Sequence, residues 1–220
     1  MATGTLLITG IVGALAFAVI EHPALTSTAS LAAIPPHSAR LPLGGVIEIA
    51  TAAMSVGIAI ALYPVLRTRS HALALGAVTF RTIEATMYIV GALITLSLPA
   101  IAGQYAQTTA LDHNAIQATA DTLVGIRNAA ILAGVLAYIT GISMYYTVLY
   151  RHRLVPRWLS GWGIAAEVPM FTACMLAAFH HTLVSTYTLL AAPIFANELA
   201  LAAWLLIKGF SPGAADAQAH

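Results

Sequence analysis

Six long stretches of apolar residues follow one another along the chain, and short polar segments separate them. A helix that crosses the hydrocarbon core of a bilayer needs about 20 mostly apolar residues. The windows that meet this requirement are 4–20, 41–66, 72–101, 122–149, 158–179 and 183–207. The third and fourth windows are long, so we expect these helices to tilt or to project beyond the hydrocarbon. The pattern predicts an all-α, polytopic membrane protein: one bundle of six transmembrane helices over residues 1–210, followed by a disordered tail at 211–220.

The composition agrees with this pattern. Of the 220 residues, 60% are hydrophobic and 8% are charged, whereas a soluble domain carries about 25% charged residues. The first window lacks the positively charged segment that begins a signal peptide, so we interpret it as a spanning helix. The formal net charge of +1 gives no indication of nucleic-acid binding. The lipid bilayer is therefore the predicted partner, and a homodimer is left open.

Basic residues are distributed unevenly between the two sides of the predicted bundle. Six of them fall in the connections on one side: Arg67, Arg69, Arg151, Arg153, Arg157 and Lys208. The opposite side carries only Arg40. Connections rich in Lys and Arg stay in the cytoplasm. Both termini are therefore predicted to be cytoplasmic.

Six ionisable residues lie inside the windows: Glu48, Arg81, Glu84, Arg127, Glu167 and Glu198. A charge at the centre of a spanning helix costs about 2.5–3.5 kcal/mol. We therefore expect these groups to face the interior of the bundle, pair with one another, or lose their charge. Four carboxylates and two guanidiniums leave two carboxylates without a basic partner. A buried carboxyl group without such a partner tends to keep its proton, and a neutral acid is a proton donor.

Helical spacing places these groups on shared stripes. Arg81, Glu84 and Tyr88 follow an i, i+3, i+7 pattern, and Arg127 and Tyr138 share a stripe of polar and small residues on the fourth helix. From the rise per residue, the central charges lie roughly 13–20 Å from the cytoplasmic helix ends. We expect all these groups to line one hollow that opens toward the outer side.

Prolines occur close to two of the carboxylates. Glu167 is followed by Pro169, and Pro193 and Asn197 precede Glu198. A proline removes one helical hydrogen bond and leaves a carbonyl group free. The fifth and sixth helices are therefore predicted to be interrupted near a site.

No metal site and no cofactor are predicted. His180 and His181 are adjacent, so on a helix they point about 100° apart and cannot easily share a metal. A site built from His22, His180 and a glutamate stays open as the alternative.

Three phrases of the sequence resemble a known family: "IALYPVLRTRSHALALGAVTFRTIEATMYIVGAL", "RLVPRWLSGWGIAAEV" and "PIFANELALAAWLLIKGF". Together they are similar to a bacterial integral-membrane family described only as a domain of unknown function (number 4386). The resemblance covers nearly the whole chain and rests mainly on 153–159, the pair Arg81 and Glu84, and the step Asn197–Glu198. It implies a six-helix bundle in the bacterial inner membrane and supplies no reaction. The family pattern has methionine where this chain has Leu199.

Three functions are open on the sequence alone. The first is a protein that binds a small lipophilic molecule or lipid in a buried Glu/Arg cavity, with acid–base catalysis of the isomerase or cyclase type on an isoprenoid-like substrate. The second is a proton-coupled transporter or exporter of small molecules. The third is a structural or regulatory subunit without a ligand, in which the buried charges only fix helix packing.

The first hypothesis assigns a role to each of the buried charged residues and to three polar neighbours. Glu84, Glu167 and Glu198 would be the catalytic proton donors or acceptors, and Arg81 and Arg127 would stabilise anionic charge. The further ligand-binding residues predicted are Glu48, Tyr88, Tyr138 and Asn197.

Overall fold

The computed structural model describes residues 31, 39–109, 112–180 and 182–211. Its helices are α2 (Arg40–Arg67), α3 (His71–Gln107), α4 (His113–Arg151), α5 (Arg157–His180) and α6 (Thr188–Ile207), with a short 3-10 helix η2 (Val184–Tyr187) before α6. Within these residues every regular element is helical, which confirms the all-α class. Five segments are long and apolar enough to cross a membrane, the last being Val184–Ile207. The predicted first span at 4–20, His22, His181 and residues 212–220 of the predicted tail lie outside the described residues.

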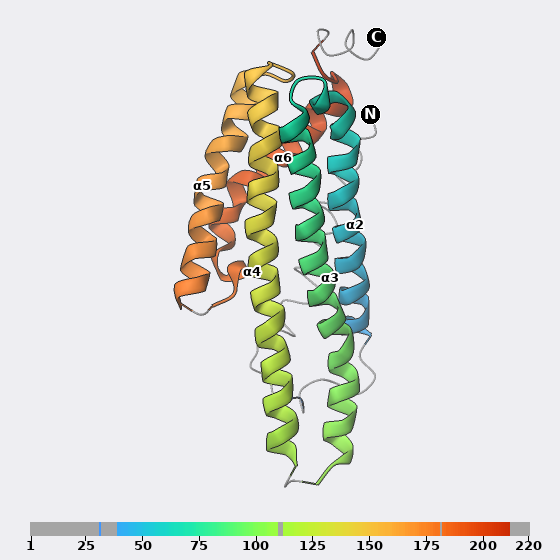
Figure 1. The fold of residues 1–220 in the computed structure, drawn as a ribbon. Helices are drawn as coiled ribbons and strands as arrows, with labels where there is room; N and C mark the ends of the chain where they lie inside the picture. The colour runs from blue at the N-terminus through green and yellow to red at the C-terminus, as the bar shows by residue number, and fades with distance from the viewer. Residues whose placement is uncertain (1–30, 32–38, 110–111, 181, 212–220) are drawn as a thin grey trace.

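The connections between successive helices are short, so neighbouring helices run in opposite directions (Figure 1). α2 packs on α3, α3 on α4, α4 on α5, and α5 on α6. The α2–α3 and α4–α5 connections and the end of α6 lie at the same end of the bundle (Figure 1). There the backbone N–H of Ser211 donates to the carbonyl oxygen of Leu154 at 3.0 Å. The connections that carry the predicted basic residues thus share one end.

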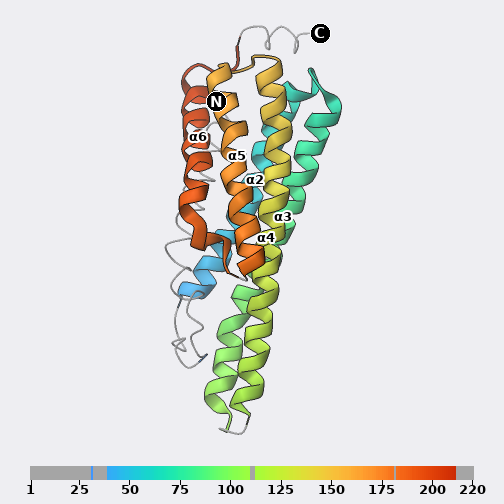
Figure 2. The same cartoon turned by 90° about the vertical axis from the view of Figure 1, so that its left-hand side faces the viewer.

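α3 and α4 are much longer than the bilayer requires. With 37 and 39 residues, each is about 55–60 Å long, against about 30 Å of hydrocarbon. The two helices extend together beyond α2, α5 and α6 at the end away from the basic connections (Figures 1 and 2). The expected great length of these two helices is therefore confirmed, and their tilt or projection beyond the hydrocarbon stays a prediction. α4 begins at His113, nine residues before the predicted window at 122, because a hydropathy window does not register a helix of polar composition.

The predicted interruptions of the fifth and sixth helices are wrong. α5 continues through Pro169 and α6 continues through Pro193, and α2 and α3 likewise contain Pro64 and Pro99. A proline removes a single hydrogen bond from the helical ladder. In a long helix held on both sides of the proline by packing, the remaining bonds keep the helical path.

Two buried tyrosines and a glycine form the centre of the packing between α4 and α5. Tyr145 and Tyr146 are at most 1% exposed. The Tyr146 ring lies directly against Gly163, where a Cβ atom would overlap the ring. A second close approach occurs at Gly141 of α4, where a Cβ atom would lie 3.3 Å from Cγ of Arg81. Gly163 thus lets Tyr146 of α4 pack directly on α5, and Gly141 lets Arg81 of α3 pack directly on α4.

Candidate functional site

All six ionisable residues of the spans face the interior. Their exposed fractions are between 3% and 9% for Glu48, Arg81, Glu84, Arg127, Glu167 and Glu198. This confirms the expectation that the cost of a charge in lipid turns these side chains inward. The structure distributes them over three separate places.

The first place, here called the central cluster, consists of Ser55, Arg81, Glu84, Tyr138 and Glu198. Nη1 of Arg81 lies 3.1 Å from Oε2 of Glu84, and the Ser55 hydroxyl donates to the same oxygen at 2.9 Å. The Arg81 guanidinium lies over the Tyr138 ring, 4.8 Å from its centroid. The Tyr138 hydroxyl donates to Oε1 of Glu198 at 2.8 Å. A continuous set of polar contacts thus joins α2, α3, α4 and α6.

The second place is a cluster made of Glu48, Thr95 and Arg127. Nη2 of Arg127 lies 3.5 Å from Oε2 of Glu48, and its Nε donates to the Thr95 hydroxyl at 2.8 Å. Gly91 allows the close approach, because a Cβ atom there would lie 3.1 Å from Oε1 of Glu48. This ion pair ties α2 to α4 across α3.

The third place holds Glu167 alone. The Ser143 hydroxyl donates a hydrogen bond to Oε2 of Glu167. Oε1 of Glu167 is buried and has no hydrogen-bond partner among the described residues. Within the part of the chain that the structure describes, Glu167 and Glu198 form no ion pair, whereas Glu84 and Glu48 do. The sequence predicted that two of the four carboxylates lack a basic partner, and among the described residues this is confirmed.

Two other predicted site residues, Asn197 and Tyr88, form contacts between helices. Asn197 is fully buried; its Oδ1 accepts from the Tyr146 hydroxyl at 2.5 Å and its Nδ2 donates to the Leu159 carbonyl at 2.9 Å. Tyr88 lies against Gly134, where a Cβ atom would be 2.8 Å from its ring. Both contacts hold helices together, and a role for either residue in binding stays a prediction.

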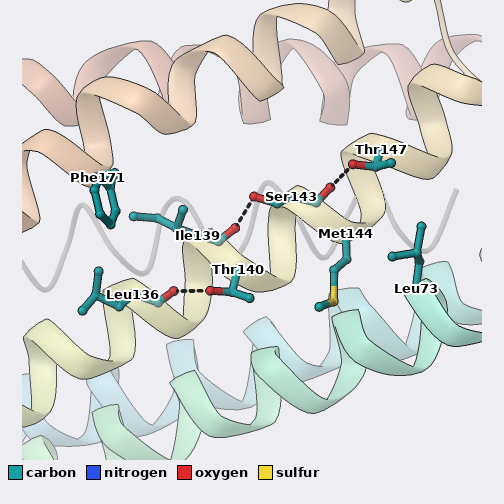
Figure 3. A pocket seen from close by; sticks show the side chains of 8 residues that line it. All are labelled: Leu73, Leu136, Ile139, Thr140, Ser143, Met144, Thr147 and Phe171. Carbon is teal, nitrogen blue, oxygen red and sulfur yellow. Dashed lines mark hydrogen bonds between the residues drawn. The ribbon is translucent and has the colours of Figure 1, made fainter.

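A groove of about 380 Å³ lies on the outer surface of the bundle between α3, α4 and α5 (Figure 3). It is lined by Leu73, Leu136, Ile139, Thr140, Ser143, Met144, Thr147 and Phe171. None of the predicted site residues lines the groove. It therefore differs from the hollow that the sequence predicted between Glu84, Glu167 and Glu198. It does adjoin Glu167, because Ser143 belongs to its wall and hydrogen-bonds to that carboxylate.

Sequence reasoning missed the groove because its residues, taken singly, are ordinary for a membrane helix. The available signal was the i, i+3/i+4 spacing of Thr140, Ser143 and Thr147, which places three hydroxyl groups on one face of α4. No group of three or more His, Cys, Asp or Glu side chains that could hold a metal ion occurs among the described residues. His180 ends α5 as an exposed residue.

Long apolar helices around buried ion pairs define this chain as a helical integral membrane protein. It belongs to the family described as Domain of unknown function (DUF4386), whose model matches residues 1–209. The resemblance found in the sequence is thereby confirmed, and the family description assigns no activity. No curated protein and no solved structure matches the chain.

Proposed function

We propose that this membrane protein binds a small lipophilic molecule in the groove between α3, α4 and α5, with the polar end of the molecule at Glu167. The observation that carries the proposal is the free Oε1 atom of Glu167. This oxygen is buried without a partner, while Oε2 is bonded to Ser143 in the groove wall. A buried acceptor without a hydrogen bond costs about 1–3 kcal/mol, so a ligand that supplies the missing bond would be stabilised.

The dimensions of the groove agree with this proposal. Its volume is within the usual range of about 300–1,000 Å³ for small-molecule sites. Its walls are apolar side chains with a few hydroxyl groups, which is the usual composition of such sites. Phe171 is 48% exposed, so a molecule dissolved in the bilayer would reach the groove from the side.

Geometry supports binding more directly than acid–base catalysis. Two of the three predicted catalytic carboxylates are held inside the central cluster, Glu84 by Arg81 and Ser55, and Glu198 by Tyr138. None of the three lines the groove, but Glu167 accepts a hydrogen bond from Ser143 of the groove wall. Glu167 is therefore the carboxylate on which proton transfer to a bound molecule would depend.

Photolabelling of the purified protein tests the proposal. An alcohol with a dodecyl chain that carries a diazirine group is expected to label groove residues such as Met144 and Phe171. The substitution Thr140→Trp fills the groove and is expected to reduce this labelling by about tenfold, the effect of about 1.4 kcal/mol in binding. Val168→Trp is the matched control, because Val168 is 66% exposed on α5 outside the groove. Labelling that is spread over all exposed apolar residues, or that Thr140→Trp leaves unchanged, would overturn the proposal.

We also propose six spans in a bacterial inner membrane, with both termini and the basic connections in the cytoplasm. The support is the shared end of the connections that carry Arg67, Arg153 and Lys208. Cys174 is the single cysteine and is buried, so it can be replaced by serine to give a background without thiols.

Labelling of single cysteines in intact cells checks this orientation. In the Cys174→Ser background, a membrane-impermeant maleimide is expected to label Thr109→Cys at once and Thr68→Cys only after lysis. Both positions are exposed and lie at opposite ends of α3. The reverse pattern would show that the basic end faces outward.

A further inference from the structure

The hydroxyl groups of the groove have already donated their protons. Thr140 donates to the Leu136 carbonyl at 2.9 Å, and Thr147 donates to the Ser143 carbonyl at 2.7 Å (Figure 3). The Ser143 proton is shared between the Ile139 carbonyl at 2.9 Å and Glu167. A hydroxyl group has one proton and two acceptor lone pairs. Toward the groove these side chains therefore offer acceptors only.

Glu167 lies behind this wall of the groove and is bonded to it through the Ser143 hydroxyl. In its ionised form Glu167 accepts hydrogen bonds and donates none, and Oε1 is the oxygen without a partner among the described residues. The groove has no lysine, arginine or histidine in its lining, and Glu167 forms no ion pair with any described residue. The hydroxyl groups that line the groove thus require a donor from the ligand, and a cation that supplies one to Glu167 favours the ionised form of this carboxyl group.

An aromatic ring lies next to this carboxylate. Phe171 follows Glu167 by four residues on α5, so both side chains lie on the same face of the helix, and Phe171 lines the groove. The face of an aromatic ring attracts a cation within about 6 Å of its centroid. An acid, hydroxyl acceptors and an aromatic ring side by side form a typical environment for an ammonium group.

We propose that the ligand class of the groove is lipophilic amines, bound as ammonium ions with N–H donated to Glu167 and the alkyl or aryl part along Leu136, Ile139 and Met144. This inference rests on the proposed function and specifies its ligand. A carboxylate within the bilayer is costly without a counter-charge. Among the described residues the protein supplies no basic partner for Glu167, so the ligand supplies it.

Competition against the photolabel tests the ligand class. Dodecylamine, dodecanol and dodecanoic acid share the same chain and differ in the head group. We expect dodecylamine to compete with the diazirine alcohol at about tenfold lower concentration than dodecanol, and dodecanoic acid to compete least. In Glu167→Gln, which keeps the shape and removes the charge, the advantage of the amine over the alcohol should disappear while the alcohol still binds. Val168→Ala is the folding control, and thermal unfolding in detergent verifies each variant.

The outcomes separate this inference from the proposed function. If the alcohol labels the groove and the amine competes no better than the alcohol, the ligand class is wrong and the binding site stands. If the amine keeps its advantage in Glu167→Gln, the assignment to Glu167 is wrong. If Glu167→Gln does not fold, Ser143→Ala decides the question, because it leaves the carboxylate with one bond fewer and should increase the preference for the amine. Should no label enter the groove, both proposals fail together.

Discussion

Replacing Arg81 with methionine is expected to destabilise the protein by about 3–5 kcal/mol, the usual cost of removing one partner of a buried ion pair. Arg81 is 4% exposed, pairs with Glu84 and stacks on Tyr138. Its loss would leave the carboxylates of Glu84 and Glu198 buried together with hydroxyl donors only. Methionine keeps an aliphatic chain in the space beside Gly141, so the change removes the charge more than the packing.

Reversible unfolding in mixed micelles measures this effect. Arg151→Met is the matched control, because Arg151 is exposed at the end of α4, and it should change the free energy of unfolding by no more than about 0.5 kcal/mol. The double variant Arg81→Met, Glu84→Gln should recover much of the loss, since it also removes one of the stranded charges. If Arg81→Met is as stable as Arg151→Met, the central cluster does not hold the bundle together.

The apolar windows and the burial of the charges could be predicted because both follow from transfer free energies. Lipid excludes a charged side chain at a cost that no local preference offsets, so Glu48 and Arg127 had to turn inward. The contact between Arg81 and Glu84 could be predicted as well, because an i, i+3 spacing brings two side chains together on any helix. By contrast, the partner of Glu48 is 79 residues away in sequence and depends on how three helices pack.

Hydroxyl partners were harder to predict than charged partners. Serines and tyrosines occur throughout membrane helices, and nothing in their spacing shows which of them reaches a carboxylate. Tyr138 was selected for its position on a polar stripe, and it does contact both Arg81 and Glu198. Ser143 was not selected, although it is the contact that connects Glu167 with the groove.

The central cluster and Glu167, two of the three places with buried charges, differ in the role that their contacts indicate. In the central cluster Glu84 is paired with Arg81 and both carboxylates accept a hydroxyl hydrogen bond from another helix, which holds the helices together. Glu167 has one buried oxygen without a partner among the described residues, and its other oxygen is bonded to Ser143 of the groove wall. The hypothesis of a purely structural protein accounts for the central cluster and leaves Glu167 unexplained.

Replacing Asn197 with leucine is expected to destabilise the protein by about 2–4 kcal/mol. Asn197 is completely buried and joins three helices, since it lies on α6, accepts from Tyr146 of α4 and donates to Leu159 of α5. Leucine has a similar size but no polar atoms, so the Tyr146 hydroxyl would stay buried without a partner. An orphaned buried donor costs about 1–3 kcal/mol, and the lost hydrogen bond to Leu159 adds to it.

A double-mutant cycle with Tyr146→Phe measures this contact. If the hydroxyl and the amide stabilise the protein mainly through each other, the double variant Tyr146→Phe, Asn197→Leu should be less destabilised than the sum of the two single variants by about 1–2 kcal/mol. Asn114→Leu, an exposed asparagine on α4, is the control for the chemical change itself. Strictly additive losses would mean that Asn197 acts through its contact with Leu159 and not through Tyr146, because residues that share a hydrogen bond do not contribute independently.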